Sequence, residues 1–426
     1  MRRWALVLSV VLFVACWAQG LQAGAAANKI TPSKTVYLAG FDHNRRNTGG
    51  VHDDIWARAV VVQVGKERLA IVACDLLGLF RDDVMRIRQK VKSAPPNRVI
   101  VLCTHGHSSP DTMGLWGPTP LQSGRDAEYV NFVIDTVAKT VDEAANKLQP
   151  ATVGFAKTTI EGISRNYLVP KVLDTEAAVM QFRSKADGKV IATLTNFACH
   201  PEVLNNDQLS ADFCHWYYQT VESKVGGVAI FANGALGEVL PVENPDPNAP
   251  KGRDWAQAER FGTLIANRVL EAIAKASFTD AVQLEHREAT YSVPLENENI
   301  KMAIAAGIIP AGASLNGDKL TTESHLVRLG DAVIFTMPGE VFTNIGVLLK
   351  RLLSAHGSPV FLFGLANDEL GYILSLADYY LDLYSFERGF SVSSEIGEAM
   401  VRSARQMAES MRLGYHGQPR RTGDEL

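Results

Sequence analysis

Runs of consecutive apolar residues alternate along the chain with segments in which apolar residues recur every three or four positions. The first pattern is typical of buried strands and the second of helices with one buried face. Two strands are expected in ARAVVVQVG and RLAIVACDLLGL, joined by a hairpin turn at Gly65-Lys66. Further strands are expected in RVIVLCTHGH, KVIATLTNFACH, GVAIFANG and PVFLFGLAN, and a second hairpin in SHLVRLGDAVIFTMPGE, turning at Gly330-Asp331.

Helices are expected between these strands. One spans Asp126 to Leu148, where five branched residues lie on a single helical stripe, and another spans Trp255 to Ala276. The others lie in RDDVMRIRQKV, WYYQTVESK, FTNIGVLLKRLL and EIGEAMVRSARQMAESM, whereas Leu295 to Ser324 looks irregular, a surface excursion. This alternation predicts an α/β fold with mixed sheets flanked by helices, without an internal repeat or a dividing linker.

The first residues resemble an export signal. Arg2 and Arg3 precede an apolar run from Trp4 to Trp17, and small residues follow in AQGLQAGAAA. The run is too short to be a convincing membrane span. Residues 1–27 are therefore predicted to be a signal peptide and 28–426 an exported domain, periplasmic or secreted. The alternative is an N-terminal anchor in which Cys16, in LFVAC, carries a lipid.

Composition narrows the class of protein. The 426 residues are 46% hydrophobic and 21% charged, which fits a large folded core and excludes a disordered chain. Lysine and arginine total 42 against 46 acidic residues, and the net charge of −4 argues against a nucleic-acid binder. Five cysteines are too few for a disulfide scaffold, so free buried thiols are expected, with one bridge as the alternative.

The residues that could take part in chemistry directly follow the predicted apolar strands. His105 and His107 are two residues apart in THGHSSP, so in an extended segment both side chains can point the same way and hold a zinc ion. The alternative is that they are loop histidines hydrogen-bonded to nearby backbone. His200 in NFACHP, Glu340 in PGEVFT and Tyr372 in LGYI each have an ordinary structural explanation when taken alone. Common signatures such as GxSxG, HExxH and CxxC are absent from the sequence.

Taken together, and in this order, THGHSSP, NFACHP, PGEVFT and LGYI resemble the neutral/alkaline (non-lysosomal) ceramidases. VYLAGFDHNRRNTGGVHDDIWARAVVV, ISRNYLVP and FANGALGEVLP extend the resemblance over most of the chain, from Val36 to Arg388. It implies a fold like the N-terminal domain of that family, and a zinc-dependent hydrolase. The implied metal ligands are His105, His200, Glu340 and Tyr372. The resemblance further implies that His107 and Arg165 polarise the scissile group.

The sequence departs from the family at two points. Leucine, as Leu240, occupies the position of a serine that the family uses in catalysis. A zinc-activated water would then be the nucleophile, with Glu238 as a candidate general base or, alternatively, a surface or capping carboxylate. The C-terminal β-rich domain of the family is expected to be absent, which puts ceramide itself in doubt as the substrate.

Two functions are compatible with these residues. The first is a zinc hydrolase that cleaves an N-acyl amide, either ceramide or a related acyl amide or ester. The second is a catalytically degenerate zinc protein that binds lipids or acyl amides, favoured by Leu240; a metal-free structural module is a third reading. The expected partners are a small-molecule or lipid substrate and a membrane surface, reached peripherally or through the N-terminus. Asp75 could orient a ligand histidine and His52 could line the pocket, or both could tie down loops.

Overall fold

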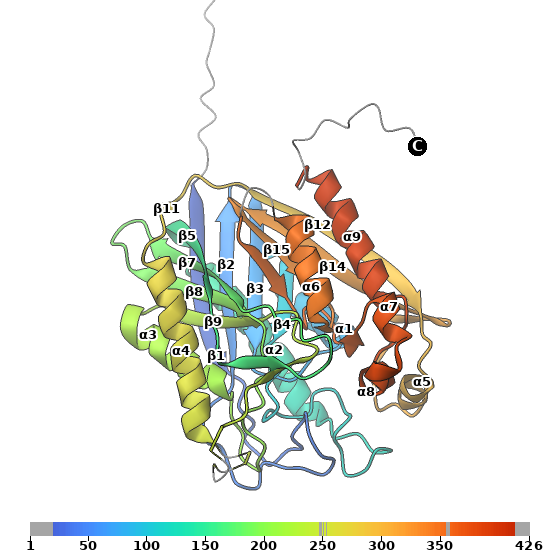
Figure 1. Cartoon of the computed structure of the whole chain (residues 1–426). Coiled ribbons are helices and arrows are strands. Elements are labelled where there is room, and N and C mark those ends of the chain that lie inside the picture. Colours follow the sequence, from blue (N-terminus) through green and yellow to red (C-terminus); the bar gives the residue numbers. More distant parts are fainter. Residues whose placement is uncertain (1–19, 247–248, 250, 253, 355–357, 414–426) are drawn as a thin grey trace, which may run out of the picture.

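A large mixed sheet forms the centre of the computed structural model, which describes residues 20–246, 249, 251–252, 254–354 and 358–413 (Figure 1). Its strand order is β4-β3-β2-β1-β5-β7-β8-β9, with β11 paired to β5, and the pairs β3–β4 and β8–β9 are parallel. The strands are β1 (Leu21–Lys29), β2 (Trp56–Val64), β3 (Glu67–Cys74), β4 (Val99–Cys103), β5 (Gln149–Thr159), β7 (Glu176–Ser184), β8 (Val190–Phe197), β9 (Val228–Asn233) and β11 (Phe278–Thr279).

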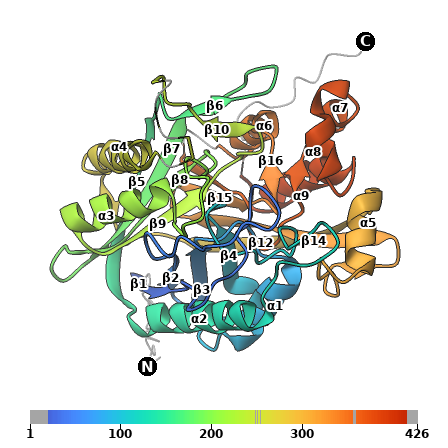
Figure 2. The same cartoon turned by 90° about the horizontal axis from the view of Figure 1, so that it is seen from below.

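A smaller sheet packs against the large one. Its order is β12-β14-β15-β17, with β13 paired to β14, and it is built from β12 (Leu284–Pro294), β13 (Leu315–Asn316), β14 (Lys319–Leu329), β15 (Ala332–Thr336) and β17 (Val360–Phe363). Two short ladders complete the strands, one from β6 (Ser164–Asn166) and β10 (Val239–Pro241), the other from β16 (Glu340–Val341) and β18 (Tyr372–Ile373). Figure 2 views the sheets end on and shows β6, β10 and β16 near α6 (Thr343–Leu353).

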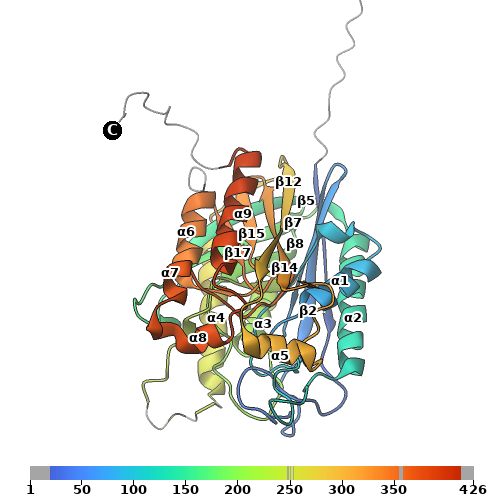
Figure 3. The ribbon, with the colours of Figure 1, turned by 90° about the vertical axis from the view of Figure 1, so that its right-hand side faces the viewer.

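Helices cover the outer faces of both sheets, so the described chain has four layers (Figure 3). One core lies between the large sheet and α2 (Ala127–Asn146), α3 (Phe213–Val225) and α4 (Trp255–Ile273). A second core lies between the two sheets, and a third between the small sheet, α6 and α9 (Ile396–Ser410). The remaining helices are α1 (Arg81–Lys90), η1 (Pro96–Arg98), α5 (Glu298–Ala305), α7 (Leu376–Tyr379), η2 (Asp382–Tyr384) and α8 (Ser385–Gly389).

The predicted α/β class with mixed sheets and flanking helices is confirmed. Both predicted hairpins are present, with Gly65 and Gly330 at positive φ in their turns. Each predicted helix is also present, and the helix expected from Asp126 begins with that aspartate as its cap, accepting a hydrogen bond from the backbone of Tyr129. The cysteines at 74, 103, 199 and 214 are free and buried, as expected.

The predicted signal boundary at residue 27 falls inside β1 (Leu21–Lys29), an inner strand of the large sheet, and this position does not support a boundary there. The strand pairs with β2 along its whole length and with β5 at its start. The small residues that look like the end of a signal serve close packing here: a Cβ on Gly24 would lie 2.2 Å from the carbonyl oxygen of Ala144 in α2. The apolar run of residues 4–17, with Cys16, lies outside the described residues.

The segment from Leu295 to Ser324 is also more regular than predicted. It contains α5 and the first half of β14, and β14 pairs with β12 over eleven positions from Leu284 to Pro294. Among the described helices, none combines the length and hydropathy needed to cross a bilayer.

Candidate metal centre and active site

The loops that follow β4 and β8 bring three histidines together. Asn233, the last residue of β9, donates hydrogen bonds from Nδ2 to the carbonyl oxygens of Thr104 (2.9 Å) and Cys199 (2.8 Å). This buried amide therefore clamps the two loops side by side, directly before His105 and His200. A further bond from the His107 amide to the carbonyl of Pro201 (3.1 Å) fixes the register between them.

His105 and His200 are oriented in the same way. Nδ1 of His105 lies 2.9 Å from the carbonyl oxygen of Leu77, and Nδ1 of His200 lies 2.9 Å from that of Val239. A carbonyl only accepts hydrogen bonds, so in each neutral ring the proton is on Nδ1 and Nε2 carries the lone pair. Carbonyl groups that hold histidine rings in this manner are typical of metal centres.

Glu340 joins the two rings. Its Oε2 lies 3.4 Å from Nε2 of His105 and 3.2 Å from Nε2 of His200. Burial alone would raise the pKa of Glu340, but the two imidazoles outweigh it and hold that pKa well below its ordinary range. Burial lowers the pKa of His200, but Glu340 and then Glu202 reverse this and raise it. The carboxylate therefore stays ionised and favours positive charge at the point where the three groups meet.

The residues present fit a metal ion at this point. Ligands about 2.0–2.1 Å from a tetrahedral ion lie roughly 3.3 Å apart, close to the distances of 3.2 and 3.4 Å between Oε2 and the two nitrogens. Two bare nitrogens and a carboxylate oxygen would repel one another without a proton or a cation between them. The nitrogens of His105, His107 and His200 also lie within 4.8 Å of one another, so the buried histidine group is compatible with a metal site.

His107 faces the space beside this point. Neither of its ring nitrogens has a hydrogen-bond partner among the described residues, although Glu202 lies 3.4 Å from Nδ1. Burial, followed by the charges of His105 and His200, holds the pKa of His107 well below its ordinary value, so its ring is neutral. Gly40 makes room for it: a Cβ there would lie 2.6 Å from the His107 ring.

Two cavities meet at His107. The first, of about 570 Å³, is mainly apolar, and His105, His107 and Glu340 are among the residues that line it. Its apolar lining includes Phe41, Leu77, Phe80, Met113, Leu115, Trp116, Ile300, Ile304, Phe386 and Phe390. The second, of about 450 Å³, adds the polar residues Tyr167, Glu202 and Glu387. His107 and Tyr372 line both, so the histidine group lies between an apolar and a more polar compartment.

Tyr372 lies opposite Glu340 in the parallel pairing of β16 with β18. Burial, and then the charge of Glu340, raises the pKa of its hydroxyl well above the ordinary value. The structure therefore brings four predicted residues of the site together with His107.

Glu238 lines neither cavity, and its position does not support the predicted role of general base. Both of its carboxylate oxygens accept hydrogen bonds from the backbone of Thr343, at 2.9 and 3.0 Å, at the start of α6. The alternative of a capping carboxylate is the correct one, although the group is buried rather than on the surface. Burial raises the pKa of Glu238 to about 7.

Arg165 and Leu240 face each other in the β6–β10 ladder. The Arg165 guanidinium pairs with the exposed carboxylate of Glu243 at 2.6 Å and lines neither cavity, so its position does not support a role as an oxyanion donor. Leu240, by contrast, lines the second cavity together with His200 and Glu202.

Asp75 and His52 stabilise the structure around the site without reaching it. Asp75 accepts hydrogen bonds from the Tyr218 hydroxyl (2.7 Å) and the Trp56 amide (2.9 Å), so it does not orient a ligand histidine. His52 stacks on Trp255, with the ring centroids 3.7 Å apart, and lines neither cavity. Asp75 thus joins the start of β2 to α3, and His52 packs against the start of α4.

Sequence reasoning missed Glu202. It lies beside His107 in the second cavity, and burial raises the pKa of its carboxyl. The available signal was its place two residues after His200, in NFACHPE, at the end of the same strand.

Comparison with known proteins places the chain in a family. The model of the neutral/alkaline non-lysosomal ceramidase N-terminal region matches residues 21–241, more than half of the chain. The neutral ceramidase of Pseudomonas aeruginosa is 24% identical over 241 residues, which is 50% of this chain but 36% of that protein, so the chain matches about a third of the relative's length.

Solved structures agree on the fold. The crystal structure of the neutral ceramidase from Pseudomonas aeruginosa superposes with a TM-score of 0.75 at 19% identity, covering 94% of this chain and 76% of the other. A ceramidase complexed with C2 gives 0.74 at 18% identity, covering 94% and 77%. The resemblance of the motifs is thus confirmed by independent comparisons, and the chain belongs to the neutral/alkaline non-lysosomal ceramidase family.

Proposed function

We propose that this protein is a zinc-dependent hydrolase of N-acyl amides, acting on ceramide or a related acyl amide or ester. The observation that carries the proposal is the meeting of His105, His200 and Glu340, where His105 and Glu340 line a large apolar cavity and His200 lines the second cavity. Family membership supports hydrolysis of an amide bond.

The donor set supports Zn²⁺ as the ion. Two imidazole nitrogens and a carboxylate, with a phenol beside them, match the ligands this ion accepts. His105, His200 and Glu340 would hold it, and Tyr372 would complete the set. When bound, Zn²⁺ supplies a Lewis acid for a carbonyl group and lowers the pKa of water to about 7.

The two cavities suggest how a substrate lies. An acyl chain fits the apolar cavity of about 570 Å³, and the amine portion fits the second, which offers Tyr167, Glu202 and Glu387 as polar partners. The scissile amide then lies beside His107, where both compartments meet.

Two side chains have the chemistry that hydrolysis needs. The neutral His107 ring donates a hydrogen bond to the oxygen of the carbonyl as negative charge develops there. Glu202 takes the proton of the attacking water and delivers it to the amine nitrogen as the C–N bond breaks, releasing a carboxylic acid and an amine. The raised pKa of Glu202 suits a group that must both accept and return a proton.

The second candidate function is a zinc-containing protein that binds lipids or acyl amides without turning them over. It is favoured by Leu240, which lines the second cavity where the family has a serine. Leucine can neither attack a carbonyl nor hydrogen-bond to it.

Turnover of a panel of fluorogenic N-acyl amides, with and without a chelator, separates these functions. The hydrolase should lose activity with the chelator, regain it when Zn²⁺ is added, and lose it in His105→Ala. His52→Ala is the matched control, since that ring stacks on Trp255 outside both cavities. Chelator-resistant turnover would contradict the metal-dependent mechanism, and tight binding without product would favour the second function.

We propose further that the protein is exported, periplasmic or secreted, on the basis of its N-terminal sequence. Since Leu21 begins an inner strand, processing would have to occur before that residue. Fractionation of the producing cells tests export, which is contradicted if the whole protein stays in the cytoplasm. Mass analysis of the exported chain tests the processing position, and an N-terminus beyond Leu21 would contradict processing before β1.

A further inference from the structure

A second group of metal-ligating side chains lies on the antiparallel pair β12–β14 and lines neither cavity. The register places Glu288 directly opposite His325, and His286 is two residues from Glu288 on the same strand. Because alternate residues of a strand share a face, these three side chains project together. Their ligand atoms lie within 4.8 Å of one another.

The two imidazole nitrogens lie close to the separation that one ion would impose. Nε2 of His286 lies 3.0 Å from Nδ1 of His325, whereas nitrogens bound to one tetrahedral ion lie roughly 3.3 Å apart. Because Nδ1 of His325 carries the lone pair, Nε2 of His286 donates to it in the metal-free arrangement, and a cation would take the place of that proton between the two nitrogens.

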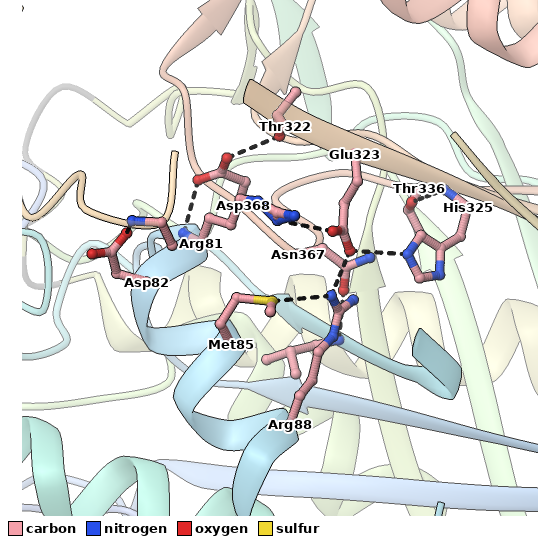
Figure 4. A network of polar contacts seen from close by, with 12 residues as sticks. Arg81, Asp82, Met85, Arg88, Thr322, Glu323, His325, Thr336, Asn367 and Asp368 are labelled. Atoms are coloured by element: carbon pink, nitrogen blue, oxygen red, sulfur yellow. Dashed lines mark hydrogen bonds and ion pairs between the residues drawn. The ribbon is translucent and has the colours of Figure 1, made fainter. Parts of the chain in front are cut away.

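Glu323 contacts the ring nitrogen of His325 that is not bonded to His286, and so orients the ring. Its Oε1 lies 2.9 Å from Nε2 of His325, and since a carboxylate only accepts, that nitrogen carries the proton and Nδ1 carries the lone pair. Figure 4 shows Glu323 between His325 and Arg88, which donates to it at 2.6 Å. A carboxylate that fixes the tautomer of a ligand histidine is a recurrent part of zinc sites.

Burial and charge also suit a cation. His286 and His325 are 7% and 1% exposed, while Glu288 is on the surface and makes no ion pair with another described residue. Of the three arginines whose charges act on His286, Arg88 pairs with Glu323 and Arg98 with Glu67, whereas Arg287 donates to the carbonyl oxygen of His286 at 2.9 Å and makes no ion pair with a described residue. Glu288 is thus a free carboxylate at the entrance to two buried nitrogens.

We propose that His286, Glu288 and His325 form a second site for a divalent transition-metal ion, with Zn²⁺ as the best match to two imidazoles and one carboxylate. The ion would cross-link β12 and β14 and take no part in hydrolysis. The competing arrangement is a purely structural hydrogen-bonded chain from His286 through His325 and Glu323 to Arg88.

Zinc binding to the full chain distinguishes these arrangements. Metal-stripped protein titrated with Zn²⁺ should bind two equivalents, Glu288→Gln should weaken one of them at least about tenfold, and His286→Ala should remove it. Glu285→Gln is the matched control, because Glu285 is on the same strand but pairs with Arg328 at 3.5 Å. It should still bind two equivalents.

A thermal readout guards against variants that do not fold. In His105→Ala, Zn²⁺ should still raise the Tm, and in His105→Ala/Glu288→Gln the rise should shrink or vanish. Glu288 is exposed, so its substitution leaves the core intact.

The proposal is overturned if the wild type binds one equivalent that His105→Ala abolishes, or if Glu288→Gln and His286→Ala bind zinc like the wild type. Loss of an equivalent in His286→Ala but none in His105→Ala would instead support this site and count against the metal centre of the proposed function.

Discussion

His107 and Arg165 differ in whether their side chains line the cavities in which the substrate would bind. Both ring nitrogens of His107 lack a hydrogen-bond partner among the described residues, and the ring lines both cavities. Arg165 pairs with Glu243 through Nη2, its buried Nε has no hydrogen-bond partner among the described residues, and the side chain lines neither cavity. A hydrogen-bond donor for developing negative charge must be close to it and available, so the two side chains should contribute unequally to hydrolysis.

We expect His107→Ala to lower kcat/KM roughly 100-fold or more, because losing one oxyanion donor typically costs about 3 kcal/mol of barrier. Arg165→Ala should lower it less than about tenfold. Both values are measured with one N-acyl amide, alongside the zinc content of each variant. An Arg165 effect equal to that of His107 would show that the arginine leaves Glu243 during the reaction, and loss of zinc in His107→Ala would make His107 a ligand.

Among the individual site residues, the sequence could identify those that directly follow the end of a predicted strand. His105, His107 and His200 each come directly after an apolar run, so their convergence could be anticipated. The role of Glu238 could not, because the backbone group that it caps belongs to Thr343, more than a hundred positions away. Glu202 was overlooked since a lone carboxylate has no pattern until its neighbour His107 is placed in space.

Glu323 links two elements that are remote in the sequence. From β14 it accepts hydrogen bonds from Arg81 (2.9 Å) and Arg88 (2.6 Å) of α1, as Figure 4 shows. Burial would raise the pKa of Glu323, but His325 and the two arginines outweigh it and lower the pKa to about 2. Ionised Glu323 therefore holds α1 against β14 of the small sheet.

This link should make stability depend on pH. A carboxyl whose folded pKa is lowered stabilises the fold above its unfolded pKa of about 4, and the contribution is lost as pH falls toward 2. The shift corresponds to roughly 3 kcal/mol. Urea unfolding of the wild type and Glu323→Gln should therefore differ most near pH 6 and progressively less toward pH 3. A difference that does not change with pH would contradict the pairing.

The packing of β1 on α2 depends on Gly24. A Cβ at this position would lie 2.2 Å from the Ala144 carbonyl oxygen, so the helix or the strand must move to admit it. Gly24→Ala should lower the free energy of unfolding by about 1–3 kcal/mol, the usual range for overpacking. In the control, Gly389→Ala, the added Cβ meets nothing within 4 Å. Equal stability of the two variants in urea unfolding would mean that β1 is not packed in this way.

The same contact explains why β1 could not be predicted. Its sequence, LQAGAAANK, has the small residues of a signal-peptide tail and contains none of the β-branched residues that are typical of strands. The reason for those small residues is the approach of α2, which becomes visible only when residues 120 positions apart are brought together. Strands such as β3 and β4 contain β-branched valine and isoleucine within apolar runs, and they could be predicted from the sequence.

On the scale of the whole molecule, the helices near the cavity mouth present apolar side chains to solvent. Tyr380, Leu381, Leu383, Phe386 and Phe390 are exposed, and the last two also line the apolar cavity. Figure 3 places α5, α7 and α8 at the same end of the described chain. Asn297, the cap of α5, binds the carbonyls that end α8, which keeps the two helices together. An exposed apolar cluster of this kind is typical of a surface that meets a membrane or another protein.

We therefore expect this cluster to bind membranes, through which an amphiphilic substrate would enter the cavity. Tyr380→Ser/Leu381→Ser should reduce the fraction of protein that sediments with phosphatidylcholine vesicles and slow hydrolysis of a vesicle-borne N-acyl amide by about tenfold, since two exposed apolar side chains together contribute on the order of 1–2 kcal/mol. Neither residue lines a cavity, so turnover of a water-soluble short-chain amide should be unchanged. Phe132→Ser, which removes an exposed side chain from α2, should leave both activities at the wild-type level. Equal sedimentation of all three proteins would show that the cluster is not a lipid-binding surface.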